Sequence, residues 1–158
     1  MLGEGHSRSD SNGRPTLPSG PAWDHGPMPS LDDAASAVAR GLAAGWSDSD
    51  LVRLLAQAVE DFERLPSDDA RADFLHEPGL TGDLVWDAAF AGLAVHLCRL
   101  AHMERSPDWT REPQRYSPRI TWIGLQPGST MQAYVYQRTP AYFKARGVML
   151  NEANLVSV

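Results

Sequence analysis

The sequence predicts a mainly α-helical protein with a small two-stranded β element near the C-terminus. Three observations support this fold class: apolar residues spaced three and four apart between positions 48 and 103, capping residues ahead of those segments, and prolines that interrupt the chain after residue 105. The chain has 158 residues, of which 42% are apolar, enough to close one sizeable core. We therefore expect a single folded domain over 30–158.

The first 29 residues are predicted to form a disordered tail. They are rich in Gly, Pro and Ser and show no apolar periodicity, so they bury too little surface to offset the entropy of ordering. Trp23 is the one aromatic residue in this segment, and it is either incidental or a docking spot for a partner. The folded part is expected to begin at Ser30.

Three helices are expected in the acidic part of the domain before residue 80. The first two, 31–44 and 48–65, each follow a Ser-x-x-Asp motif, which begins at Ser30 and at Ser47. Such a motif satisfies the unpaired amides of a first helical turn and places a carboxylate at the positive end of the helix dipole. A third, short helix is expected over 67–77.

A longer helix over 84–103, capped by Asp83, is predicted to lie in the middle of the core. Its large apolar residues recur at spacings of four, three, four and three, and they are Trp86, Phe90, Leu93, Leu97 and Leu100. Most of the other positions are Ala, Val or Cys, so the helix is apolar over most of its circumference.

The chain after residue 105 is rich in proline, which excludes a long helix over 106–128 and favours extended segments. The elements expected there are a strand over 120–125, a helix from about 129 to 137, a short helix between Thr139-Pro140 and Gly147, and a strand over 148–150 able to pair with 120–125. The stretch 133–136 also fits a strand, so the sequence does not decide between helix and strand there.

Charge divides the chain into an acidic part over 30–103 and a basic part over 104–158. Residues 1–97 carry a net charge of −10 and residues 98–158 a net charge of +4. In the basic part, cations alternate with aromatic residues, and the candidate partner-binding residues are Arg105, Trp109, Arg111, Arg115, Arg119, Trp122, Lys144 and Arg146. This composition serves protein hot spots, phosphate contacts with base stacking, or solvated loop arginines beside tryptophans that pin the loop to the core.

The sequence gives less support to a DNA-binding motif, a metal site or an enzyme active site. The first two expected helices have a spacing faintly like that of a helix-turn-helix, but the second carries mostly acidic side chains, which DNA phosphates would repel. Cys98 and His102 lie four apart, yet no CxxC or HExxH motif accompanies them, so neither a metal nor a cofactor is expected. No nucleophile elbow or phosphate loop occurs, so no enzyme is expected, unless its catalytic residues are dispersed in the sequence.

The expected location is the cytoplasm. The one cysteine cannot form an internal disulfide, and the N-terminus lacks the basic and then apolar pattern of a signal peptide. The longest apolar stretch, 84–103, contains Asp87, His96 and Arg99, which are costly in a bilayer, so no membrane span is expected.

Several segments of the C-terminal half carry a family resemblance. They are Gly82-Asp-Leu-Val-Trp-Asp87, Leu93-Ala-Val-His-Leu97, Pro107-Asp-Trp-Thr110, Trp122 and Thr139-Pro-Ala-Tyr-Phe-Lys-Ala-Arg-Gly-Val148. This half resembles small bacterial proteins encoded beside nucleotidyltransferase-type toxins of the AbiEii class, and the C-terminal part of some helix-turn-helix regulators of high-GC bacteria. The resemblance implies an antitoxin-like or regulatory protein with no catalytic residues.

The function expected from the sequence is therefore a non-catalytic protein-binding module that modulates a partner enzyme, with a nucleotidyltransferase-type toxin as the expected partner. A nucleic-acid-associated regulator that uses the Arg and Trp residues is the alternative. A small enzyme of unknown chemistry is the third hypothesis.

Overall fold

The computed structural model describes residues 29–125 and 128–156, and the tail predicted over 1–29 lies outside this part of the chain except for Pro29. The elements are α1 (Leu31–Ala43), α2 (Asp48–Glu63), α3 (Asp68–Phe74), α4 (Leu84–Leu100), η1 (Asp108–Arg111), η2 (Pro113–Arg115), β1 (Thr121–Trp122), α5 (Gln132–Arg138), α6 (Ala141–Lys144), β2 (Val148–Met149) and η3 (Glu152–Leu155), where η denotes a 3-10 helix. The predicted fold class, mainly helical with a two-stranded element near the C-terminus, is confirmed.

The long helices begin at the predicted caps. Ser30 Oγ accepts a hydrogen bond from the Asp33 amide at 3.2 Å. Ser47 and Asp50 form a reciprocal capping box, and Asp83 Oδ1 accepts from the first amides of α4. These contacts satisfy amides that have no partner inside the helix, which is why local sequence alone located the helix starts.

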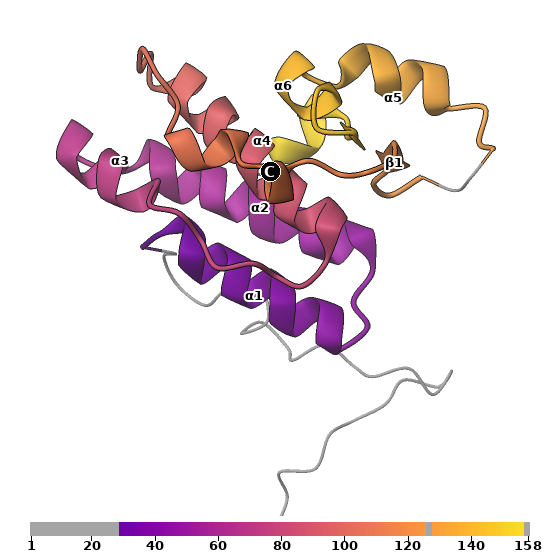
Figure 1. Ribbon diagram of the computed structural model, residues 1–158, viewed down its shortest axis with the longest axis horizontal. Coiled ribbons are helices and arrows are strands. Elements are labelled where there is room, and N and C mark those ends of the chain that lie inside the picture. Colours follow the sequence, from indigo (N-terminus) through magenta and orange to yellow (C-terminus); the bar gives the residue numbers. More distant parts are fainter. Residues whose placement is uncertain (1–28, 126–127, 157–158) are drawn as a thin grey trace, which may run out of the picture.

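The central helix of the core is α4. Phe90, Leu93 and Leu97 are fully buried, and the helix contacts α1, α2, α6 and both η1 and η2. Figure 1 shows α1 at one edge of the molecule and α5 at the opposite edge, with α2 and α4 between them. The prediction that α4 lies in the middle of the core is confirmed.

The end of α4 comes three residues earlier than predicted. His102 adopts a left-handed backbone with φ of 55°, its amide bonds the Arg99 carbonyl at 3.2 Å, and the Met103 amide bonds the Cys98 carbonyl at 2.9 Å. These bonds form a Schellman motif, which usually has glycine at the left-handed position. Because histidine stands there, the sequence carried no stop signal at residue 102.

The proline-rich segment departs from the predicted extended form. It contains the short 3-10 helices η1 and η2, in which prolines occupy the N-cap and the first position and so give up no internal hydrogen bond. The predicted strands are shorter than expected and pair in parallel, with Thr121 opposite Val148 and Trp122 opposite Met149. Within the described residues, no helix is long and apolar enough to cross a membrane.

Candidate functional site

Three of the eight predicted partner-binding residues are buried inside the protein. Arg115 is 0% exposed, Arg146 is 5% exposed and Trp109 is 8% exposed. A buried side chain cannot contact a partner in this fold, so the assignment of these three residues to a binding surface is corrected. Their roles are internal.

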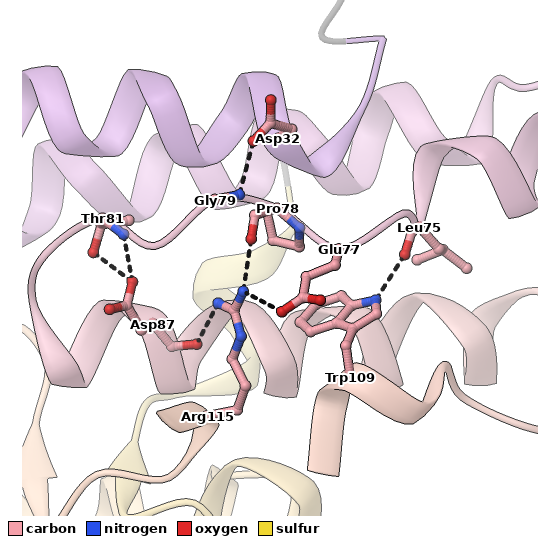
Figure 2. Close-up of polar contacts among 9 residues, drawn as sticks. All are labelled: Asp32, Leu75, Glu77, Pro78, Gly79, Thr81, Asp87, Trp109 and Arg115. Atoms are coloured by element: carbon pink, nitrogen blue, oxygen red, sulfur yellow. Dashed lines mark hydrogen bonds and ion pairs between the residues drawn. The ribbon is translucent and has the colours of Figure 1, made fainter. Parts of the chain in front are cut away.

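Arg115 holds the loop between α3 and α4. Its guanidinium donates hydrogen bonds to the carbonyls of Pro78 at 2.7 Å and Asp87 at 3.3 Å, and it lies 3.5 Å from a carboxylate oxygen of Glu77 (Figure 2). Trp109 lies under the guanidinium at 4.8 Å and donates from its indole nitrogen to the Leu75 carbonyl at 3.0 Å. The cation therefore satisfies the Pro78 carbonyl of the loop and also bonds the Asp87 carbonyl, which lies in the first turn of α4.

The same loop is held by two carboxylates. Asp32 of α1 accepts from the Gly79 amide at 2.8 Å, and Asp87 of α4 accepts from both the amide and the hydroxyl of Thr81 at 2.6 and 2.7 Å (Figure 2). The bond to Asp32 joins residues 47 positions apart, and the bonds to Asp87 join residues six positions apart. The two carboxylates thus tie the loop to α1 and to α4.

Arg146 has a comparable structural role at the other end of the basic segment. Its Nε and one terminal nitrogen donate to the Thr110 carbonyl at 3.2 and 2.6 Å, and the other terminal nitrogen donates to the Tyr142 carbonyl at 2.8 Å. The guanidinium lies 5.0 Å from the centre of the Tyr116 ring, and burial lowers its pKa. Arg146 thus ties η1 to the chain that follows α6.

The other five predicted residues lie at or near the surface. Arg105, Arg111 and Arg119 are exposed, while Trp122 and Lys144 are half-buried. Arg105 and Arg111 share one acidic neighbour, Asp108, at 3.8 and 2.6 Å. Of these cations, Lys144 is the one that contacts an exposed aromatic ring, Tyr136 of α5.

Among the described residues, the two most exposed aromatic side chains lie on α5, a helix for which the sequence predicted no function. Within this seven-residue helix Val135 is buried, whereas Tyr134 is 43% exposed and Tyr136 is 49% exposed. The Arg138 guanidinium lies 4.2 Å from the centre of the Tyr134 ring, and Lys144 Nζ lies 4.1 Å from that of Tyr136. Met131, Tyr134, Tyr136, Arg138 and Lys144 are called the α5 surface below.

The sequence around the α5 surface is positively charged. Between Pro113 and Asn151 the chain contains no Asp or Glu, but it contains Arg115, Arg119, Arg138, Lys144 and Arg146. Two of these five cations are buried, so the charge available to a partner comes from Arg119, Arg138 and Lys144. Of these three cations, Arg119 and Lys144 were predicted from the sequence as partner-binding residues, whereas Arg138 was not.

Two cavities adjoin the end of the chain that follows β2. The larger, of about 690 Å³, lies between α2, the end of α4, the end of α5 and η3. The smaller, of about 420 Å³, is lined by α2, the segment after β1, and the Tyr134 side of α5. Both sizes fall within the usual range of ligand pockets, about 300–1,000 Å³.

The larger cavity contains a buried histidine. His96 is 6% exposed, and its Nδ1 lies 2.7 Å from the Tyr142 hydroxyl. Burial lowers the pKa of His96, Glu152 opposes this effect and Arg99 adds to it. The ring is therefore neutral at pH 7 and presents one hydrogen-bonding nitrogen beyond the Tyr142 contact.

In the part of the chain that the structure describes, no group of three or more His, Cys, Asp or Glu side chains is arranged to hold a metal ion. Cys98 is buried within the core, whereas His102 is exposed beyond the end of α4. The four-residue spacing of this pair therefore does not bring the two side chains into one site.

Comparisons with protein-family models, curated proteins and solved structures find no match to this chain.

Proposed function

We propose that this protein is a non-catalytic binding module that regulates a partner protein through the α5 surface. The observation that carries the proposal is that α5 buries Val135 and leaves two tyrosines exposed, each beside a cation, in a stretch of chain without acidic residues. Tyr, Arg and Met are enriched in protein interfaces, and Tyr supplies a large contact area at a low entropic cost.

The geometry of α5 indicates the shape of the partner. Residues two positions apart on a helix point about 200° apart, so Tyr134 and Tyr136 lie on opposite flanks of the face that buries Val135. Gln137 and Ala133 form the outer ridge between them. A partner that contacts both tyrosines must surround the helix, as a groove surrounds a docked helix.

The charge of the α5 surface indicates the electrostatics of the partner. Lys144 has no acidic neighbour in the sequence between 113 and 151, so an acidic groove complements it. Arg138 also lines the larger cavity, where Glu60, Glu63 and Glu152 lie, so part of its charge is already balanced. Figure 1 places α5 at the edge of the molecule opposite α1, far from the acidic first turn of that helix. The proposed partner surface is therefore concave and acidic.

A protein partner is favoured over a nucleic acid. One face of each tyrosine ring is occupied by a cation of the protein itself, which leaves less ring area for base stacking. The chain also carries a net charge of −6, which opposes approach to a polyanion. The resemblance of the C-terminal half suggests a more specific partner, a nucleotidyltransferase-type toxin encoded by a neighbouring gene, with this chain acting as its antitoxin.

Capture of the neighbouring gene product by the purified full chain tests the proposal. Tyr136→Ala should speed dissociation by about tenfold or more if this residue is a hot spot. Arg138→Glu combined with Lys144→Glu should slow association, most strongly at low salt. Arg64→Glu, at the C-cap of α2, is the control for a reversal of surface charge, since the Arg64 side chain is 70% exposed and lies outside the α5 surface.

The outcomes separate the hypotheses. Equal capture by the parent chain and the α5 variants would reject this surface. Failure to capture the neighbouring product would reject the antitoxin assignment. Tight, salt-dependent retention of a labelled oligonucleotide that is lost in the double charge reversal would favour the nucleic-acid-associated regulator instead.

A further inference from the structure

Two carboxyl groups and one guanidinium meet where the loop between α3 and α4 packs against the segment 108–115, called the η1–η2 segment below. Glu77 belongs to the loop, Glu112 joins η1 to η2, and Arg115 ends η2. A carboxylate oxygen of Glu77 lies 3.5 Å from the Arg115 guanidinium (Figure 2). The carboxyl group of Glu112 lies within hydrogen-bonding reach of that of Glu77. One cation therefore faces two acidic side chains.

Glu112 contains a buried oxygen that lacks a donor. Its Oε1 is closed to solvent, although the residue as a whole is only half-buried, and no group in the described part of the chain donates a hydrogen bond to it. Arg115 does not supply this bond, because its terminal nitrogens bond the Pro78 and Asp87 carbonyls and its Nε is itself buried without a partner. Burial of a carboxylate oxygen without a donor is costly, so the ionised form of Glu112 is disfavoured.

A proton held between the two carboxyl groups changes this balance. Two carboxylates and one guanidinium carry a net charge of −1, whereas protonation of Glu112 makes the three side chains neutral together. Two ionised carboxylates only accept hydrogen bonds, but a protonated Glu112 donates one to Glu77. This hydrogen bond is the largest cause that raises the pKa of Glu112; burial and the charge of Glu77 add to it, and Arg115 opposes it.

The other charged groups near the cluster are bonded elsewhere or exposed. On η1, Arg111 pairs with Asp108 at 2.6 Å. On α4, the carboxylate of Asp87 accepts hydrogen bonds from Thr81. His76, which precedes Glu77 in the chain, is exposed. The charges that act on Glu112 are therefore those of Glu77 and Arg115.

We propose that Glu112 and Glu77 form a proton-controlled clamp between the η1–η2 segment and the loop that precedes α4. In the closed state Glu112 is protonated and bonds Glu77, which in turn pairs with Arg115. Loss of the proton to solvent leaves two carboxylates beside one guanidinium, and their repulsion opens the contact between Glu112 and the loop. Arg115 keeps its bond to the Pro78 carbonyl, so the loop loosens without detaching.

The clamp stabilises the protein at low pH. Because the pKa of Glu112 is higher in the folded than in the unfolded chain, its contribution is complete below the ordinary pKa of glutamate, about 4.3, and is lost as pH rises through the raised value. Glutamine cannot ionise and keeps a donor for Glu77, so Glu112→Gln imitates the closed state at every pH. The free energy of unfolding of the parent relative to this variant should therefore fall as pH rises above about 4 and then level off.

Urea unfolding of the full chain over a series of pH values tests this expectation. Glu104→Gln, which removes one negative charge at an exposed position outside the cluster, is the matched control. A difference between the parent and Glu112→Gln that does not change with pH would overturn the proposal. An equal pH dependence for Glu104→Gln would also overturn it, because it would indicate a general effect of net charge.

Carbon NMR of the Glu112 carboxyl group follows the proton directly. Its midpoint should lie above the ordinary range of glutamate in the parent, and Glu77→Gln should lower it, since the neighbouring charge is removed. At pH 8, amide exchange over 76–80 should be slower in Glu112→Gln than in the parent, because glutamine keeps the contact with the loop. A midpoint that Glu77→Gln leaves unchanged, or equal exchange in the two proteins, would refute the clamp.

Discussion

The guanidinium of Arg115 lies 4.8 Å from the centre of the Trp109 ring, and both side chains donate hydrogen bonds to carbonyls of the chain between α3 and α4. A cation and an aromatic residue that resemble a binding motif in sequence are here a buried support for a loop. The loop forms neither a strand nor a helix, so Trp109 and Arg115 supply the hydrogen-bond donors that its carbonyls would otherwise find in a regular element.

Arg115→Met is expected to destabilise the protein by about 1–3 kcal/mol, because the buried Pro78 carbonyl loses its donor, whereas the Asp87 carbonyl keeps the helical amide of α4. Arg111→Met is the control, since Arg111 is exposed and bonds exposed partners. Urea midpoints measure both changes. Equal midpoints for the two variants would show that Arg115 does not support the loop.

Gly92→Ala is expected to destabilise the protein although alanine favours helix. A Cβ at position 92 would lie 2.5 Å from a ring carbon of the fully buried Phe143. Overpacking costs about 1–3 kcal/mol and exceeds the gain of about 1 kcal/mol in helix propensity.

A double-mutant cycle with Phe143→Leu checks the cause of this effect. The smaller side chain should relieve part of the strain, so the double variant should be more stable than the sum of the two single changes predicts. Greater stability of Gly92→Ala alone than of the parent would refute the close approach of α4 and α6.

His102→Gly is expected to stabilise the protein by about 0.5–1 kcal/mol. The backbone of His102 is left-handed, which is strained for a residue with a Cβ and free of strain for glycine. Ala101→Gly, at a negative φ one residue earlier, should be neutral or destabilising. Thermal unfolding distinguishes the two, and destabilisation by His102→Gly would contradict the Schellman ending of α4.

Cys98 is expected to resist modification in the folded protein. It is buried, and burial raises its pKa to about 11, so the reactive thiolate is scarce at pH 8. Labelling by a thiol reagent should be slow in native buffer and fast in urea. Rapid labelling of the native protein would place Cys98 outside the core.

The same shift predicts a loss of stability in alkali. The unfolded thiol ionises near pH 9 and the folded one near pH 11, so the unfolded state releases its proton first and gains free energy between these values. The stability of the parent relative to Cys98→Ala should therefore fall as pH rises through this window. A pH-independent difference between the two proteins would contradict the raised pKa.

The starts of the long helices and the identity of the core helix followed from the sequence because they depend on neighbours within one or two turns. A hydroxyl or carboxylate three residues before an amide caps it whatever the rest of the chain does, as Ser30, Ser47 and Asp83 illustrate. The apolar circumference of α4 likewise requires burial on most sides. The pairing of the two short strands was expected from their position, but not its parallel direction.

The role of the charged residues was decided by the tertiary structure alone. Arg111 and Arg115 are four positions apart in one segment, yet one is exposed and the other is fully buried. The difference arises from the carbonyls of Pro78 and Asp87, which approach Arg115 from residues 37 and 28 positions away. Composition gives the number of cations in a segment, whereas the burial of one of them depends on backbone carbonyls far away in sequence, such as that of Pro78, which only the packed chain brings to it.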